Sequence, residues 1–162
     1  MVVGVAGAVL LLCGLSTAAQ AQTVSLRTTR SQIGFVGGGS IDPEQWFVGV
    51  FWETPEIGSR FHLRPGIDGG FGGDVNVATI NFDFIAKFSL GSSGWKFIQG
   101  GGPAIVIAKF DTFEGSSGTE VGAGGTYIIG FSHIDGFIGE FRIGGGGNVP
   151  ALKLTAGYSI GF

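Results

Sequence analysis

The chain has few charged residues, a single cysteine and no long apolar run beyond its first 15 residues. Charged side chains make up 13% of the 162 residues, and the formal net charge is −3. Because no block of Lys or Arg is present to hold a phosphate backbone, the sequence predicts no nucleic-acid partner. The cysteine, Cys13, lies near the N-terminus, so the remaining chain offers neither a disulfide nor a thiol ligand for a metal. A helix that spans a membrane needs about 20 apolar residues, and no such run follows residue 15.

Glycine and phenylalanine are what the chain has in abundance. It contains 33 Gly and 15 Phe, and hydrophobic residues make up 44% of the sequence. So much glycine disfavours helices, and so few charges are unusual for the surface of a soluble domain. An apolar chain without a membrane helix is typical of a transmembrane β-barrel, in which only every second residue of a strand faces lipid.

The first 21 residues predict a cleavable signal peptide for export. Residues 2–15 are almost entirely Val, Ala, Leu and Gly, and Ala19 and Ala21 then form the small-x-small pattern of a signal-peptidase site. The apolar run of about 14 residues is too short for an anchoring helix. We therefore expect cleavage after Ala21, a polar lead-in over residues 22–30 and one barrel domain over residues 31–162.

Eight strand-like segments, separated by turn-forming clusters, follow the lead-in. Strands of about ten residues between clusters of Gly, Pro, Asn and Asp are typical of all-β barrels and sandwiches. We expect strands at residues 32–39, 45–53, 60–71, 75–89, 95–110, 120–133, 137–145 and 149–162. The predicted fold class is therefore all-β, as an eight-stranded antiparallel up-and-down transmembrane β-barrel.

Alternation within these segments predicts which side chains face lipid. Successive side chains of a strand point to opposite faces. In residues 75–89, Phe82 and Phe84 fall on one face and Asp83 and Lys87 on the other, interrupted only by Ile85. We expect the phenylalanines outside, in the lipid bilayer of the outer membrane. A competing hypothesis is a soluble periplasmic or secreted barrel that binds a small apolar ligand, which requires the phenylalanines inside.

In residues 45–53, alternation leaves open which set of aromatic side chains faces lipid. Trp46 and Trp52 lie six residues apart on one face, so that each could sit in one of the two aromatic belts of a membrane barrel. This assignment would turn Phe47 and Phe51 inward.

Charges on the inward face must pair with one another, because eight strands enclose an interior just wide enough for side chains. An unpaired charge at low dielectric costs on the order of several kcal/mol. We therefore expect an interior filled by a charge network rather than an open pore. Its expected members are Arg64, Lys87, Arg142 and Lys153, matched with Asp68, Asp83, Glu120 and Glu140. Inward glycines leave some room for the alternative, a proton or ion path; they are Gly122, Gly124 and Gly130.

No motif predicts chemistry. Residues 157–161 match the G-x-S-x-G pattern around Ser159, but that motif needs a strand-to-helix turn at the serine, and only Phe162 follows the motif. His62 and His133 motivate a third hypothesis, a lipid-modifying outer-membrane enzyme. Ser132 is adjacent to His133, but neighbours in a strand face opposite sides. We expect no enzymatic activity, no catalytic residue, no cofactor and no metal site.

Four stretches resemble a known family. They are residues 61–68 (FHLRPGID), 81–84 (NFDF), 100–104 (GGGPA) and 157–162 (GYSIGF). Together they resemble the small outer-membrane β-barrel proteins of OmpA-like type from Gram-negative bacteria, over about residues 31–162. The resemblance implies an eight-stranded up-and-down barrel without a common enzymatic activity. It also implies that Phe162, with Tyr158 and Ile160, is the signal recognised by the barrel-assembly machinery.

Overall fold

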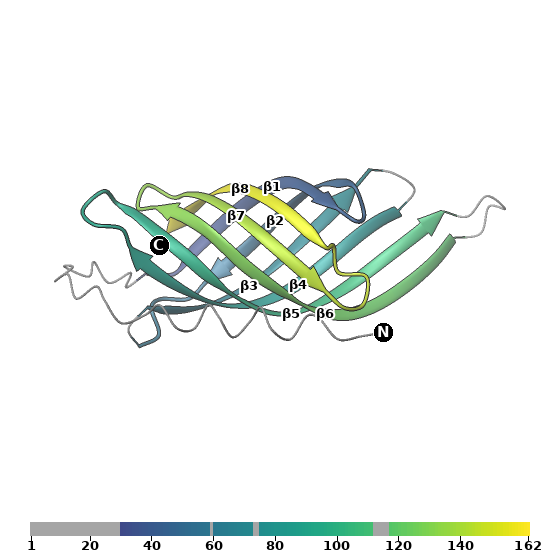
Figure 1. Ribbon diagram of the computed structural model, residues 1–162, viewed down its shortest axis with the longest axis horizontal. Coiled ribbons are helices and arrows are strands. Elements are labelled where there is room, and N and C mark those ends of the chain that lie inside the picture. The colour runs from purple at the N-terminus through teal and green to yellow at the C-terminus, as the bar shows by residue number, and fades with distance from the viewer. Residues whose placement is uncertain (1–29, 59, 73–74, 112–116) are drawn as a thin grey trace, which may run out of the picture.

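The protein forms a closed antiparallel barrel in which each strand pairs with the next and β1 pairs with β8 (Figure 1). The computed structural model describes residues 30–58, 60–72, 75–111 and 117–162. The predicted signal peptide and all but the last residue of the predicted lead-in lie outside the described residues. The strands are β1 (Gln32–Ile41), β2 (Gln45–Glu53), β3 (Phe61–Phe71), β4 (Val75–Ser89), β5 (Trp95–Asp111), β6 (Ser117–His133), β7 (Phe137–Gly145) and β8 (Leu152–Gly161). In the part of the chain that is described, no helix is long and apolar enough to cross a membrane.

The predicted eight-stranded fold is confirmed, and the bounds of β2, β4 and β7 are those expected from the sequence. β8 starts at Leu152 rather than at residue 149. Pro150 lacks the N–H that a strand ladder needs, and Val149 is 8% exposed, packed in an apolar cluster. These residues therefore belong to the connection between β7 and β8.

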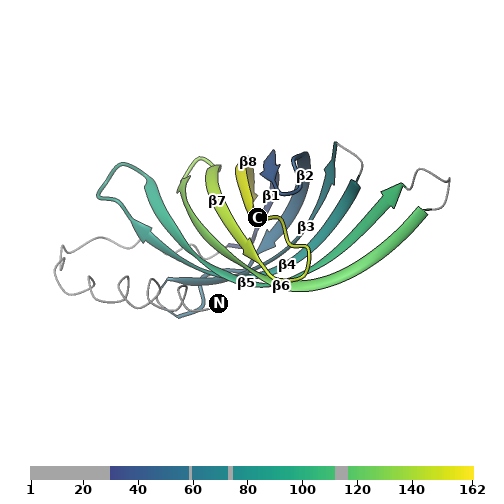
Figure 2. The same cartoon turned by 45° about the vertical axis from the view of Figure 1, so that its right-hand side comes forward.

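The two ends of the barrel carry different connections. The ends of β1, β3, β5 and β7 lie with the starts of β2, β4, β6 and β8 at one end of the barrel, which we call the loop end. The C-terminus, the start of β1 and the β4–β5 and β6–β7 turns lie at the opposite end, which we call the terminal end. β5 and β6 have 17 residues each and extend farther than their neighbours at the loop end (Figure 2).

The β7–β8 turn packs against this extended part of β6. Among the described residues, β6 pairs with β7 only as far as Gly125. Beyond that point, a Cβ on Gly122 would lie 2.2 Å from the carbonyl oxygen of Gly147, and one on Gly124 would lie 2.4 Å from that of Gly145. Gly122 and Gly124 thus allow β6 to contact the β7–β8 turn closely. The backbone of that turn occupies the space beside them.

Outward and inward faces follow the predicted alternation. Phe82 and Phe84 are 46% and 50% exposed, whereas Asp83 and Lys87 are 1% and 8% exposed. An antiparallel barrel with this arrangement presents aromatic side chains to its surroundings and charges to its lumen.

β2 follows the same rule, with Trp46 and Trp52 outside and Phe47 and Phe51 buried in the lumen. The Phe51 ring fits because its partner across β1 is Gly34. A Cβ on Gly34 would lie only 2.1 Å from that ring.

Candidate functional site: the interior ion pairs

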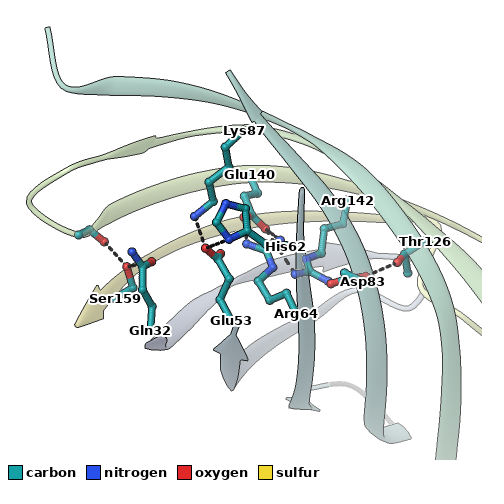
Figure 3. Close-up of polar contacts among 11 residues, drawn as sticks. Gln32, Glu53, His62, Arg64, Asp83, Lys87, Thr126, Glu140, Arg142 and Ser159 are labelled. Atoms are coloured by element: carbon teal, nitrogen blue, oxygen red, sulfur yellow. Dashed lines mark hydrogen bonds and ion pairs between the residues drawn. The ribbon is translucent and has the colours of Figure 1, made fainter. Parts of the chain in front are cut away.

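Arg64 of β3 and Glu140 of β7 form a bidentate ion pair across the lumen (Figure 3). Nη1 donates to Oε1 at 2.5 Å and Nη2 donates to Oε2 at 3.1 Å. Both residues are buried, and the guanidinium also lies 5.0 Å from the centre of the Phe51 ring. Paired N–H···O bonds of this geometry are among the stronger hydrogen bonds in proteins. The pair connects two strands that are not neighbours in the barrel wall.

Glu140 is shared with a second pair nearer the loop end. Arg142 lies 3.4 Å from Glu140 Oε2 and donates to Asp83 Oδ2 at 2.9 Å. Thr126 Oγ1 donates to the other oxygen of Asp83 at 3.1 Å. β3, β4, β6 and β7 are therefore joined through one continuous set of side chains.

Further toward the loop end, Lys153 of β8 donates to Asp68 of β3. Asn81 donates to the second oxygen of Asp68 at 3.0 Å. The ammonium group also lies 4.9 Å from the centre of the Phe47 ring. Each inward phenylalanine of β2 thus contacts a cation of the lumen, a favourable arrangement where water is excluded.

The terminal end of the lumen holds a third group around Glu53 of β2. Lys87 Nζ donates to Glu53 Oε1 at 2.6 Å, and His62 Nδ1 lies 3.4 Å from the same oxygen. His62 Nδ1 is also 2.9 Å from the carbonyl oxygen of Thr54. Glu53 is 0% exposed and His62 is 2% exposed.

The structure brings seven of the eight expected residues into these groups and places Glu120 elsewhere. Glu120 lies opposite Ala108 on the inward face of β6, but it is exposed, because this part of β6 extends past the last pair with β7. The acid expected there is supplied by Glu53 instead. Alternation in β2 could have indicated it, since Glu53 shares the face of Phe47 and Phe51.

Apolar side chains fill the lumen beside the ion pairs in two clusters. Ile85, Ile98 and Ile128 are fully buried together toward the terminal end. At the loop end, a second cluster comprises Val77, Ala104, Val106, Ala108 and Val149. Gly130, the third inward glycine, faces Glu140, whose Cγ would lie 2.8 Å from an added Cβ.

The two histidines lie in separate surroundings. His133 contacts Asp135 at 3.1 Å, and its Nε2 lies 3.3 Å from the backbone carbonyl of Ser93. His62 instead faces Glu53. In the part of the chain covered by the structure, no group of three or more His, Cys, Asp or Glu side chains could hold a metal ion.

The end of β8 exposes apolar side chains on its outer face. Tyr158, Ile160 and Phe162 are 45%, 58% and 64% exposed. The Phe162 N–H donates to the carbonyl oxygen of Ser31 at 3.0 Å, so the terminal residue continues the pairing with the β1 side of the barrel.

Two solved structures share this architecture. The chain is similar to the N-terminal β-barrel domain of Pseudomonas aeruginosa OprF, with 14% identity, a TM-score of 0.60 and coverage of 84% of this chain and 98% of that one. It is equally similar to Neisserial surface protein A, with 14% identity, a TM-score of 0.60 and coverage of 82% and 95%. No protein-family model and no curated protein matches the sequence. The chain has the eight-stranded fold of these outer-membrane barrels.

Proposed function

We propose that this protein is an integral outer-membrane β-barrel with a structural, non-enzymatic role in the integrity of the envelope. The observation that carries the proposal is the inverted distribution of polarity. Large apolar side chains cover the outside of all eight strands, while four acids and four bases pair inside. A lipid bilayer is a favourable environment for the apolar outer face. A narrow lumen requires the inward charges to pair with one another.

The interior pairs support a plugged barrel rather than an open pore. Four acids (Glu53, Asp68, Asp83 and Glu140) match four bases (Arg64, Lys87, Arg142 and Lys153). Among the described residues, these paired charges therefore balance and call for no counter-ion. The two apolar clusters beside the pairs leave few polar groups for a continuous water column.

The competing hypothesis, a soluble barrel that binds a small apolar ligand, has no comparable support. That hypothesis needs the phenylalanines of β4 to line a cavity, whereas Phe82 and Phe84 lie on the outer face. The enzyme hypothesis gains no support either, because among the described residues His62 and His133 contact acids and backbone groups, not a serine hydroxyl.

Membrane insertion and closure can be tested together. We expect the protein to fractionate with outer membranes and to migrate faster on gels before heating than after, as folded barrels do. Reconstituted into planar bilayers, it should give no stable conductance above that of the lipid alone. A product that is monomeric and soluble without detergent would overturn membrane insertion, and steady single-channel currents would overturn the plugged lumen.

Export and assembly are further parts of the proposal. We infer that residues 1–21 are removed during export and that the barrel-assembly machinery recognises Tyr158, Ile160 and Phe162. Their side chains are exposed on one face of the last strand, accessible to a partner before lipid covers them. N-terminal sequencing of the protein from outer membranes should begin at Gln22, and any other start would contradict the assigned cleavage site.

A further inference from the structure

A small cavity in the lumen adjoins both the Asp83 and the Asp68 ion pairs. It measures about 20 Å³, and its wall is formed by β1, β2, β3, β4, β7 and β8. The polar side chains in this wall are Asp68, Asn81, Asp83, Arg142 and Thr155. One water molecule needs about 10 to 15 Å³ of such space, so the cavity admits a single water and no larger ligand.

Thr155 brings to this cavity a hydroxyl group that has no hydrogen-bond partner among the described residues. The residue is 2% exposed. Its neighbour on β1 is Gly38, which has no side chain, and its neighbour on β7 is Glu140, whose two carboxylate oxygens accept from Arg64. Because an unpaired buried hydroxyl costs free energy, Thr155 favours a hydrogen-bonding ligand in the cavity.

The charged groups of the wall can supply the other contacts of a buried water. A guanidinium has five N–H donors and a carboxylate has about four acceptor positions, more than the ion pairs described above use. A water molecule can therefore accept from Arg142 and donate to Asp68 or Asp83 while it bonds to Thr155. These are about three hydrogen bonds, the usual number for a buried water.

The balance of charge around the cavity favours a neutral ligand over an ion. Asp83 is paired with Arg142 at 2.9 Å, and Asp68 is paired with Lys153 at 2.5 Å. A bound cation would lie close to two basic groups, and a bound anion close to two acids. Water meets the same donors and acceptors without adding a charge at low dielectric.

We propose that this cavity binds one buried water molecule, which hydrogen-bonds to Thr155 Oγ1 and to the charged groups of its wall. The water joins the Asp83 and Asp68 ion pairs into one network across the lumen. It also attaches β8 to that network at Thr155, in addition to Lys153. The site depends on the geometry of the lumen and not on the proposed role in the envelope.

Magnetisation transfer from water to methyl groups, measured by nuclear magnetic resonance on the folded protein in detergent micelles, tests the proposal. We expect a cross-peak between water and the Thr155 methyl group, because a buried water remains beside it. Thr79 is the internal reference, since it bears a hydroxyl and is 1% exposed but does not line the cavity. Its methyl group should give no such cross-peak. This comparison is made in the wild type and needs no variant to fold.

A pair of valine variants tests the part played by the hydroxyl. Thr155→Val should abolish the cross-peak at residue 155 and lower the midpoint of urea unfolding by roughly 0.5 M, because the water loses a hydrogen-bond partner. Thr79→Val, the matched control, should keep the cross-peak at Thr155. A dry cavity predicts the opposite shift of the midpoint, because valine then removes an unpaired buried hydroxyl.

Heat-modifiable migration verifies that each variant is folded. The proposal is overturned if the wild type shows no cross-peak at Thr155, or if Thr79 gives an equally strong one, which would assign the signal to exchange of protein hydroxyls. A midpoint that Thr155→Val raises or leaves unchanged would overturn it as well.

Discussion

Replacing Glu140 with leucine would deprive two buried arginines of a shared partner. Arg64 would lose both of its hydrogen bonds to the carboxylate, at 2.5 and 3.1 Å, and is 1% exposed. Arg142 would keep its contact with Asp83 at 2.9 Å. Removing one member of a buried pair leaves an uncompensated charge, and typically costs about 3 to 5 kcal/mol. We expect Glu140→Leu to lower the free energy of unfolding by an amount in that range.

Replacing Arg64 together with Glu140 separates two contributions to the free energy of unfolding: the penalty for an unpaired buried charge and the net contribution of the ion pair. In Arg64→Met/Glu140→Leu no arginine at position 64 remains to be satisfied, and replacing a buried pair by apolar side chains is often neutral or stabilising. We expect the double variant to be more stable than Glu140→Leu alone. Asp135→Asn, which alters an exposed pair, should cost less than about 1 kcal/mol.

Urea unfolding of the barrel in phosphatidylcholine vesicles provides the measurement. Tryptophan fluorescence and gel migration should report the same transition, and the slope of the free energy against urea should be alike in all variants. If the free energy of unfolding of Glu140→Leu lies within about 1 kcal/mol of the wild-type value, Arg64 and Glu140 are not closely coupled. The same conclusion follows if the double variant loses as much free energy of unfolding as Arg64→Met and Glu140→Leu lose together.

Three further variants test other parts of the structure. Gly34→Ala places a methyl group against the Phe51 ring and should destabilise the barrel by about 1 to 3 kcal/mol, whereas Gly139→Ala, with nothing within 4 Å of the added Cβ, should be near neutral in the same urea assay. Equal effects of the two would contradict the close approach at Gly34. Phe84→Arg puts a charge on the lipid face and should cost about 2 to 4 kcal/mol in vesicles, so an unchanged transition would place Phe84 away from lipid. Deleting Phe162 should reduce the assembled fraction in cells by pulse-chase while purified protein refolds normally, and unimpaired assembly in cells would exclude it as the signal.

The strand positions and their faces could be predicted because each depends on local sequence. Clusters of turn residues mark the strand ends, and period-two alternation separates Phe82 and Phe84 from Asp83 and Lys87 without knowledge of any neighbour. The same reasoning placed Trp46 and Trp52 outside and Phe47 and Phe51 inside, as the burial of these side chains confirms. Properties of a single strand are therefore recoverable from its own residues.

Contacts between strands could not be predicted, because they depend on register. Gly34 makes room for Phe51 only because the two lie opposite each other in the β1–β2 ladder. The sequence contains 33 glycines and does not indicate which of them faces an inward ring. In the same way, the turn that occupies the space at Gly122 and Gly124 comes from residues more than 20 positions later in the chain.

Glu53 pairs in the lumen, whereas Glu120 was expected to do so. The difference shows that the face on which a side chain lies and its position along the barrel axis are determined separately. Alternation assigns Glu120 to the inward face, and its partner Ala108 is indeed inward. Yet Glu120 lies five residues beyond Gly125, the last residue of β6 paired with β7, which is roughly 16 Å at about 3.3 Å per residue. At that height β6 has no pairing with β7, so the carboxylate is exposed and needs no buried cation. Lys87 instead requires an acid at the opposite end, and Glu53 on the inward face of β2 lies within reach. The balance of buried charge is therefore set by which inward residues fall inside the closed part of the barrel, and strand stagger decides that as much as side-chain alternation does.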